Sequence, residues 1–348
     1  MESQLRILLI GFQRLYNSEE YMKRLLFSHK SDIDGMGEVV LSLIAFGNIE
    51  YILCKNIWDL EQQFLSAYDN NIFNNYDLIY ITDLSLTREA LERIVNDEDV
   101  MNKLYIFDHH ETALDCGLNK YPNFNIRIED ENGPSCATQI YYEYLVENNY
   151  IQRNKLLDQY VEMTRREDTY EWKRLNDTAS HDLAILYNQV GYAQYIDLMH
   201  KKLKAGINST NTRFEFDNLE KAMIEQKKSD IEEKVKGFVK QIRIKDIALK
   251  DGEIAKVGIC FIIYEYRNEI ADFIKFRQID SDNINPEVFN IDVIAMIAME
   301  VNQVSLRSIK DNGYARKVAE LYGGGGHDNA AGIPISEEIY LRLINQII

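Results

Sequence analysis

The chain of 348 residues carries 39 Lys and Arg against 56 Asp and Glu, which gives a formal net charge of −17 at neutral pH. Its length suffices for two or three domains, and a hydrophobic fraction of 46% is that of a globular protein, not of a disordered one. The acidic balance argues against a protein that mainly grips long duplex nucleic acid, because that task needs clustered Lys and Arg. A short phosphorylated substrate at one local site remains compatible with this charge.

The N-terminal sequence and the cysteines indicate the cellular location of the protein. The apolar run at residues 8–12 is too short to span a membrane and lacks a signal-peptide cleavage site. The spacing of Leu5, Leu8, Leu9, Phe12 and Leu15 predicts an amphipathic helix instead. The four cysteines are scattered without a C-x-x-C pair, as is typical of reduced thiols. We therefore expect a cytoplasmic protein with no membrane partner.

Short apolar strands alternate with amphipathic stretches through the first half of the chain. The expected strands cover residues 25–28, 50–54, 78–82, 104–107 and 125–128. The expected helices between them cover residues 38–45, 60–66, 87–95 and 135–146. This alternation predicts βαβ units and a mostly parallel sheet.

The second half begins with a helical pattern over residues 158–240 that ends in a strongly charged segment, 218–240. Apolar runs then predict strands at residues 242–249, 254–264, 270–276 and 293–297. The predicted architecture is α/β throughout. It comprises an N-terminal parallel-sheet domain (1–185), a helical connector (186–240) and a smaller C-terminal α/β domain (241–348).

Carboxylates and imidazoles follow three of the predicted strands. In open parallel sheets, ligands bind outside the carboxyl ends of the strands, so these side chains are expected to meet in one crevice. Crowded carboxylates are costly unless cations neutralise them, which favours a metal site. The residues concerned are His29, Asp32 and Asp34 in SHKSDIDG, Asp83 after LIYIT, and Asp108, His109 and His110 after LYIF.

The spacing of these residues favours two ions over one. Asp32 and Asp34 flank a single residue, so each can face a different ion, and Asp83 from a neighbouring strand can bridge both. Mixed carboxylate and imidazole ligation suits Mn²⁺, with Mg²⁺, Co²⁺ or Zn²⁺ as rivals. Two such ions, roughly 3.5–4 Å apart, would activate water and clamp the oxygens of a phosphoryl displacement. A structural role is the more common outcome for any one His-Asp pair, but the joint placement favours metal binding.

A second group of candidate residues lies near the C-terminus, where Gly323–Gly326 are followed by His327. Glycines permit close backbone approach, and backbone N–H groups bind phosphate; a flexible loop is the alternative. Upstream, Arg307 ends an apolar strand and can hold a phosphate bidentately. An ordinary surface arginine is the competing interpretation.

These motifs, taken in order, resemble the DHH phosphoesterases that carry a DHH-associated C-terminal domain. The resemblance rests on SHKSDIDG, the strand before Asp83, Asp108–His109–His110 and GGGGHDNAAG, and it covers nearly the whole chain. The family includes RecJ-type exonucleases, cyclic-di-AMP phosphodiesterases and small oligoribonucleases that also act on 3′-phosphoadenosine 5′-phosphate.

The resemblance implies two Mn²⁺ ions and a role for each matching residue. The first ion would be held by His29, Asp32 and Asp83, and the second by Asp34, Asp83, His109 and Asp168. Glu167 and Asp177 are neighbouring alternatives to Asp168. The spacing between His29 and Asp32 departs from the one usual in the family.

The remaining roles implied by the resemblance concern the substrate. His110 would contact the scissile phosphate, and Asp108 would orient a histidine. The substrate's far phosphate or sugar would be bound by Arg307, Gly323, Gly324, Gly325, Gly326 and His327. Trp172 and Tyr170, close to Asp168, could stack a base, although core packing is the more common role of such aromatics.

The function implied is that of a manganese-dependent phosphoesterase for short single-stranded RNA, with 3′-phosphoadenosine 5′-phosphate as a further substrate. The alternatives are a cyclic-di-AMP or pApA phosphodiesterase, an exopolyphosphatase, and a non-catalytic nucleotide-binding sensor. The chemically intact motifs disfavour the sensor, and the acidic charge disfavours long polyanions. The sequence leaves the oligomeric state open, a homodimer included.

Overall fold

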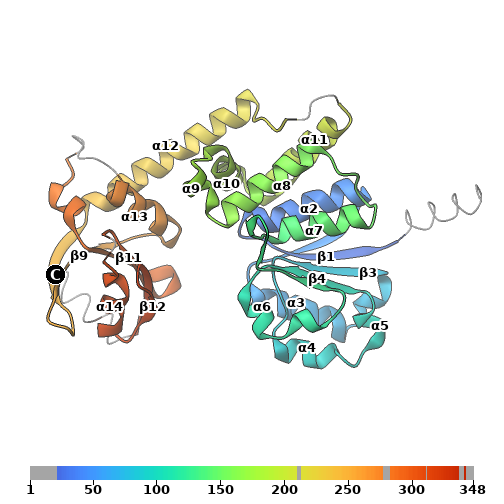
Figure 1. Cartoon of the computed structure of the whole chain (residues 1–348), viewed down its shortest axis with the longest axis horizontal. Coiled ribbons are helices and arrows are strands. Elements are labelled where there is room, and N and C mark those ends of the chain that lie inside the picture. Colours follow the sequence, from blue (N-terminus) through green and yellow to red (C-terminus); the bar gives the residue numbers. More distant parts are fainter. Residues whose placement is uncertain (1–21, 210–212, 277–282, 311, 337–340, 342–348) are drawn as a thin grey trace, which may run out of the picture. The chain divides into compact units, whose positions relative to one another are not determined.

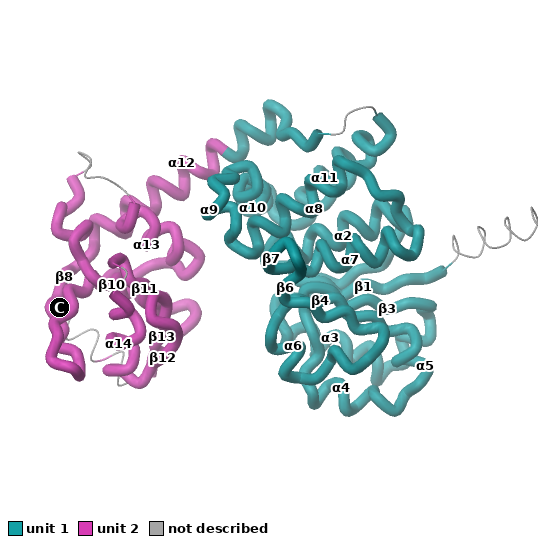
Figure 2. The backbone as a smooth tube through the Cα atoms, viewed as in Figure 1, with its two compact units in different colours: residues 1–224 teal, residues 225–348 magenta. Residues whose placement is uncertain are grey.

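The computed structural model describes residues 22–209, 213–276, 283–310, 312–336 and 341. The amphipathic helix expected over residues 5–15 lies outside these described residues. The chain divides into two compact units, residues 1–224 and 225–348 (Figure 2). The boundary falls within helix α12 (Asn218–Lys240). Among the described helices, none combines the length and the apolar character needed to cross a lipid bilayer.

Unit 1 is built on a five-stranded sheet in the order β2-β1-β3-β4-β5, and every pairing in it is parallel. The prediction of a parallel sheet is therefore confirmed, and the strands lie within a few residues of the expected ranges. The strands are β1 (Arg24–His29), β2 (Glu50–Cys54), β3 (Leu78–Thr82), β4 (Leu104–Asp108) and β5 (Phe124–Ile126).

Helices cover both faces of this sheet (Figure 1). One face carries α2 (Ile33–Phe46) and α7 (Ala137–Glu147). The other carries α3 (Ile57–Asp69), α4 (Arg88–Ile94), α5 (Glu98–Met101) and α6 (Glu111–Asp115). Helix α2 begins before its expected start at residue 38, because the Asp32 side chain caps it by accepting a hydrogen bond from the Gly35 N–H at 3.2 Å.

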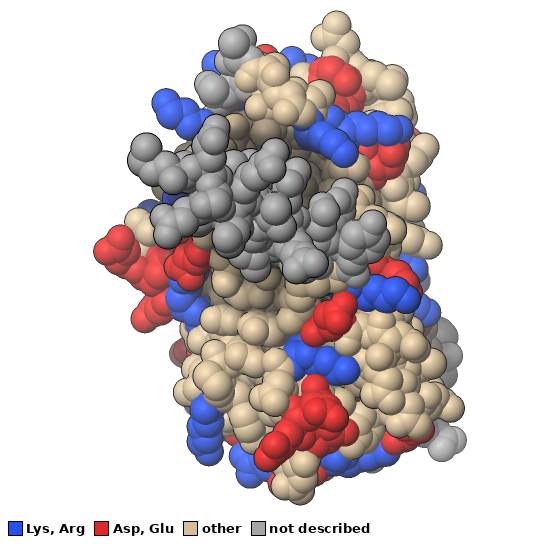
Figure 3. Space-filling view, turned by 90° about the vertical axis from the view of Figure 1, so that its right-hand side faces the viewer, with Lys and Arg blue, Asp and Glu red and all other residues tan. Residues whose placement is uncertain are grey.

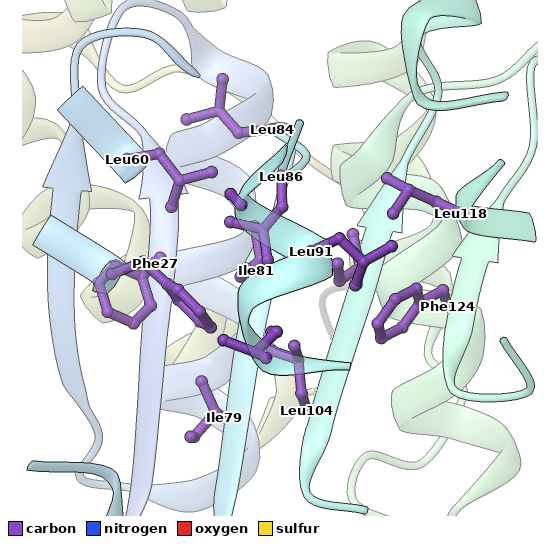
Figure 4. Close-up of a cluster of buried hydrophobic side chains, with 14 of the residues drawn as sticks. Phe27, Leu60, Ile79, Ile81, Leu84, Leu86, Leu91, Leu104, Leu118 and Phe124 are labelled. Carbon is purple, nitrogen blue, oxygen red and sulfur yellow. The ribbon is translucent and has the colours of Figure 1, made fainter. Parts of the chain in front are cut away.

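The face toward α3 and α4 holds a continuous apolar core (Figure 4). Phe27, Ile79 and Ile81 point into it from the sheet, and Leu60 and Leu91 meet them from the helices. All five are almost fully buried. Each such side chain contributes about 1.5–3 kcal/mol on burial, which makes the sheet a rigid base for the residues at its edge.

Four helices complete unit 1, namely α8 (Lys155–Asp168), α9 (Glu171–Leu175), α10 (Thr178–Val190) and α11 (Tyr192–Ile207). Helices α8, α10 and α11 pack against α2 and against one another. Helix α8 ends at Asp168, so its last turn delivers that carboxylate. Residues 186–207 of the expected connector thus lie in helices α10 and α11 of unit 1.

Unit 2 contains a six-stranded mixed sheet in the order β12-β13-β11-β10-β9-β8. Only β9 and β10 pair in parallel among its described strands. Its strands are β8 (Arg243–Ala248), β9 (Ile254–Phe261), β10 (Val293–Ala298), β11 (Gln303–Ser308), β12 (Gly325–His327) and β13 (Ala330–Pro334). Helix α14 (Tyr314–Leu321) connects β11 to β12.

Two expectations for unit 2 are wrong. Residues 270–276 form part of helix α13 (Arg267–Phe276), not a strand, because the buried Ile270, Ala271 and Ile274 recur at helical spacing. The flexible-loop alternative for the glycine run also fails over Gly325 and Gly326, which pair with β13 as an edge strand. The apolar content of residues 270–276 did not distinguish a helix from a strand. Glycine has a low preference for strands, so the sequence did not predict one at Gly325 and Gly326.

Candidate metal centre

The predicted site residues converge at the carboxyl edge of the parallel sheet in unit 1. His29 is the last residue of β1 and Asp108 the last residue of β4. Asp83 directly follows β3 and has a left-handed backbone conformation (φ 55°). Its N–H donates a hydrogen bond to the Phe107 carbonyl oxygen at 2.9 Å, which extends the pairing between β3 and β4 by one residue. Strained backbone of this kind at a strand end is often found at functional sites.

Gly35 allows the start of α2 to approach β1. A Cβ atom at this position would lie 2.0 Å from the carbonyl oxygen of His29, so no other residue fits without moving the backbone. The close approach holds Asp32 and Asp34, at the N-terminus of α2, beside the end of β1. The SDIDG sequence is therefore a packing requirement as well as a source of carboxylates.

His29, Asp32 and Asp83 form one candidate ligand group. The Nδ1 atom of His29 lies 2.8 Å from Asp32 Oδ2 and 3.1 Å from Asp83 Oδ2. Burial disfavours the charged imidazole, but hydrogen bonds to the two carboxylates outweigh it and raise the pKa of His29 to about 11. The unusual spacing between His29 and Asp32 does not keep the three side chains apart.

A second candidate group surrounds His109. Its Nε2 atom lies 3.3 Å from Asp83 Oδ1, 3.5 Å from Asp168 Oδ2 and 3.7 Å from Asp34 Oδ2. His109 Nε2 and Asp168 Oδ2 are both buried and make no hydrogen bond. The two oxygens of Asp83 thus face different groups, Oδ2 toward His29 and Oδ1 toward His109. Asp83 therefore joins the two candidate groups.

The charges of this cluster are unbalanced without cations. Burial, followed by the nearby charges of Asp32 and Asp34, raises the pKa of Asp83 well above its ordinary value. Burial and the charge of Asp34 do the same to the pKa of Asp168. Bound divalent ions would reverse both effects. Together with the unpartnered His109 and Asp168 atoms, carboxylate and imidazole donors in this number fit a divalent-metal site.

The two sequence alternatives to Asp168 lie elsewhere. Glu167 Oε1 faces His181 Nδ1 at 3.5 Å. Asp177 Oδ2 accepts hydrogen bonds from Arg166 at 2.9 Å and from the Ser180 hydroxyl at 2.7 Å. Among these three acids, Asp168 is the one that joins a metal-compatible group in the described part of the chain.

Asp108 is placed to orient His110. Its Oδ1 atom accepts hydrogen bonds from the His109 N–H at 2.7 Å, the His110 N–H at 3.1 Å and His110 Nδ1 at 2.7 Å, and its Oδ2 atom accepts one from Ser85 Oγ. The hydrogen bond to Asp108 is the main cause that raises the pKa of His110. The His110 side chain is 50% exposed, so its Nε2 edge remains accessible.

The sequence did not single out Glu38 or Thr138, although both lie at this centre. Glu38 is fully buried one helical turn after Asp34, and Thr138 hydrogen bonds with Asp34 from the start of α7. The only signal for Glu38 was an acid amid the apolar and glycine residues of IDGMGEVVL. Thr138 gave none, since its partner lies 104 residues away.

In unit 2 the structure brings Arg307 and His327 together on one sheet. Both pair with Ala330, Arg307 from β11 and His327 from β12, so their side chains project from the same face. Arg307 donates a hydrogen bond to Asn268 Oδ1 at 3.2 Å. The N–H of Gly324 donates to the Ala319 carbonyl oxygen at 2.9 Å, so this part of the glycine run is used within the fold.

Comparisons with known proteins agree with this description. The chain matches no family profile. It is 28% identical over 319 residues to oligoribonuclease NrnB of Bacillus subtilis (strain 168), covering 90% of this chain and 73% of that protein. A solved DHH domain, from a member of a family of ribosomal proteins, superposes with a TM-score of 0.50 at 13% identity, covering 94% and 86% of the two chains. The pGpG-specific phosphodiesterase PggH of Vibrio cholerae gives a TM-score of 0.44 at 14% identity over 93% and 98%.

Three findings support a DHH-type phosphoesterase. They are the order of the motifs, the carboxylates and imidazoles at the carboxyl edge of a parallel sheet, and the similarity to a curated oligoribonuclease over most of the chain. The fold shared with a solved DHH domain is consistent with them. The chain is therefore similar to the DHH phosphoesterases in its motifs, its fold and its sequence.

Proposed function

We propose that this protein is a manganese-dependent phosphoesterase that hydrolyses short single-stranded oligoribonucleotides, with 3′-phosphoadenosine 5′-phosphate as a further substrate. The observation that carries the proposal is the position of Asp83, whose two carboxylate oxygens face His29 and His109 separately. The relative named as an oligoribonuclease supports the substrate class.

Two divalent ions would be held by the candidate ligand groups. His29, Asp32 and Asp83 would bind the first, and Asp34, Asp83, His109 and Asp168 the second. When bound, such ions supply Lewis-acid activation of the phosphoryl group and of a water molecule. We favour Mn²⁺ because the donors mix oxygen and imidazole nitrogen, and Mg²⁺ or Co²⁺ are the alternatives.

His110 is proposed to contact the scissile phosphate. Its Nδ1 is engaged by Asp108, which leaves Nε2 to donate a hydrogen bond to a phosphate oxygen. The raised pKa of His110 favours the charged imidazole, which stabilises negative charge developing on the phosphate. In unit 2, Arg307, His327 and the backbone at Gly323, Gly325 and Gly326 are proposed to bind the substrate's far phosphate or sugar.

The surface charge supports a short substrate. On the face shown in Figure 3, the Lys and Arg side chains are interspersed with Asp and Glu and form no continuous stripe among the described residues. A processive exonuclease would need a long basic channel to follow the nucleic-acid backbone. The net charge of −17 agrees with a substrate only a few nucleotides long.

The proposal is tested with a substrate panel in the presence of Mn²⁺. The panel contains a labelled five-nucleotide RNA, 3′-phosphoadenosine 5′-phosphate, pApA, cyclic-di-AMP and polyphosphate. We expect the highest kcat/KM on the short RNA. Preference for cyclic-di-AMP or pApA, or for polyphosphate, would overturn the assigned substrate in favour of those activities. Nucleotide binding without turnover of any substrate would indicate a sensor.

A matched pair of variants links this activity to the candidate centre. Asp83→Asn removes the charge of the shared carboxylate and is expected to abolish turnover and Mn²⁺ binding together. Asp99→Asn makes the same chemical change on exposed helix α5 and should leave both unchanged. Retained activity in Asp83→Asn would remove the assignment of Asp83 as the shared ligand.

A further inference from the structure

Glu38 is a buried acid on α2 with no role assigned so far. Its side chain is fully buried, and it lies one helical turn from Asp34. Burying a carboxyl group in apolar surroundings costs several kcal/mol unless hydrogen bonds compensate for lost water. The contacts of Glu38 therefore show what the acid is retained for.

The main contact of Glu38 is with Ser28, the residue before His29. Ser28 Oγ lies 2.9 Å from Glu38 Oε2 and 2.6 Å from the carbonyl oxygen of Gly35. A serine hydroxyl has one hydrogen and cannot donate to two acceptors at once. Both contacts are good hydrogen bonds when Glu38 carries a proton and donates it to Ser28 Oγ, while Ser28 donates to Gly35. This chain links α2, β1 and the turn that carries Asp32 and Asp34.

The link from Glu38 through Ser28 continues across the sheet to Thr82, the residue before Asp83. Thr82 pairs with Ser28 in the register of β1 and β3. Its hydroxyl donates a hydrogen bond to the Phe27 carbonyl oxygen at 3.3 Å, and Glu38 Oε1 makes no hydrogen bond. Burial, followed by the charges of Asp34 and Asp83, raises the pKa of Glu38 well above its ordinary value. This agrees with the proton that the hydrogen-bond count requires.

We propose that Glu38 is a positioning residue of the metal centre, which holds the ends of β1 and β3 and the start of α2 at the spacing two metal ions require. It does so through Ser28, which directly precedes the candidate ligand His29 and pairs across the sheet with Thr82, the residue before Asp83. This inference rests on the proposed function, because it assumes that the centre binds metal. Glu38 itself touches neither ion nor substrate.

Two variants of similar size separate hydrogen bonding from packing. Glu38→Gln keeps the volume and a donor toward Ser28, whereas Glu38→Met keeps the volume alone. Mn²⁺ binding is measured without substrate, from the electron paramagnetic resonance signal of free Mn²⁺. We expect the Kd of Glu38→Gln to stay within about twofold of the wild type, and that of Glu38→Met to rise about 10–100-fold, as is usual for groups that orient ligands.

The Mn²⁺ dependence of kcat provides a second measurement, which a loss of protein stability alone would not change. If Glu38 acts by positioning ligands, raising Mn²⁺ should restore much of the kcat of Glu38→Met, with KM for RNA unchanged. Wild-type Mn²⁺ affinity in folded Glu38→Met would overturn the proposal. If Glu38→Met does not fold, Ser28→Ala takes its place, with a several-fold weaker Mn²⁺ affinity expected and an unchanged affinity overturning the proposal. If the wild-type protein itself binds no Mn²⁺, the proposed function is overturned as well. This outcome differs from one in which only the proposed role of Glu38 fails, because the wild-type protein then still binds Mn²⁺.

Discussion

Asp34 and Thr138 are joined by hydrogen bonds at both the side chain and the backbone of Asp34. The Thr138 N–H donates to Asp34 Oδ1 at 2.8 Å, and its hydroxyl donates to the Asp34 carbonyl oxygen at 2.6 Å. The Ala137 N–H donates to Asp34 Oδ2 at 2.8 Å. These N–H groups open helix α7, whose own N-cap residue Cys136 provides no side-chain cap. One carboxylate therefore caps a helix from a distant segment and remains a candidate metal ligand.

Removing the Thr138 hydroxyl should loosen this link. We expect Thr138→Val to lower the free energy of unfolding by about 1 kcal/mol, because a buried hydrogen bond is lost while the volume is kept. Mn²⁺ affinity should fall with it, since Asp34 is less firmly held. Urea unfolding with an unchanged m-value, together with Mn²⁺ titration, checks both effects. Thr138→Ser keeps the hydroxyl and is the control; a Thr138→Val protein as stable as the wild type would contradict the assigned link.

The stability of the metal-free protein should depend on pH through the candidate centre. The pKa values of Asp83 and Asp168 are raised on folding, so ionising them costs stability as the pH rises above the range of ordinary aspartates. The raised pKa of His29 contributes stability that is complete below its unfolded value of 6.5 and declines as the pH rises from there toward about 11. Between mildly acidic and mildly basic pH, Asp83, Asp168 and His29 therefore all lower the stability of the metal-free protein as the pH rises.

Mn²⁺ should offset this loss, because cations favour the ionised carboxylates and compete with protons for the same atoms. We expect Mn²⁺ to raise Tm more at about pH 8 than at about pH 5.5, where protons hold the ligands. Thermal unfolding with and without Mn²⁺ at the two pH values measures the difference. In Asp83→Asn, the difference between the Mn²⁺-induced Tm increases at the two pH values should largely disappear. An equal Tm increase at both pH values in the wild type would argue against raised carboxyl pKa values.

A substitution in strand β12 of unit 2, which contains Gly325 and Gly326, tests whether this strand binds substrate. A Cβ at Gly326 would lie 2.7 Å from Ala331 Cα and 2.8 Å from the Ala330 carbonyl oxygen, and its φ of 137° disfavours any other residue. A Cβ at Gly237, on helix α12 and outside the glycine run, would instead meet open space. We expect Gly326→Ala to cost about 1–3 kcal/mol of local strain and to displace His327, which raises KM for short RNA. Mn²⁺ affinity should stay unchanged.

Gly237→Ala, on helix α12, is the control and should leave KM near the wild-type value. Steady-state kinetics with the five-nucleotide RNA and Mn²⁺ titration of each variant give the comparison. Equal KM values for Gly326→Ala and Gly237→Ala would contradict a substrate-binding role for strand β12.

The sequence predicted the sheet of unit 1 well for a physical reason. Strands buried on both faces, such as β3 and β4, read as continuous apolar runs, so their limits are marked by the first polar residue. In unit 2 the segment at Ile270 and Ile274 is also apolar, but its period is helical and its length is that of a strand. Such short segments are decided by packing against neighbours, which the sequence does not display.

The convergence of the candidate ligands was predictable because strand ends meet at one edge of a parallel sheet, and the structure brings His29, Asp83 and His109 together there. The supporting contacts were not predictable in the same way. Glu38 reads as an exposed acid until α2 is placed on the sheet, and Thr138 meets Asp34 only through tertiary packing. Such support depends on which helix faces lie against the strand ends.

Trp172 is the remaining candidate for contact with the substrate. Its ring stacks on that of His181, with centroids 4.1 Å apart and planes at 8°, and His181 faces Glu167, the neighbour of Asp168. Tyr170, 56% exposed and in the left-handed conformation, lies between Asp168 and this stack in the chain. A nucleobase near these rings would change the surroundings of Trp172.

Intrinsic fluorescence can test this because the chain has two tryptophans, Trp58 and Trp172. Trp58→Phe leaves Trp172 as the sole tryptophan, and we expect AMP with Mn²⁺ to quench its emission, whereas ribose 5-phosphate, which lacks the base, should not. Trp172→Phe leaves Trp58, which is 70% exposed on α3 and should respond equally to both ligands. Equal responses of Trp172 to AMP and ribose 5-phosphate would assign the stack to packing of α9 on α10, because only a base contact distinguishes the two ligands.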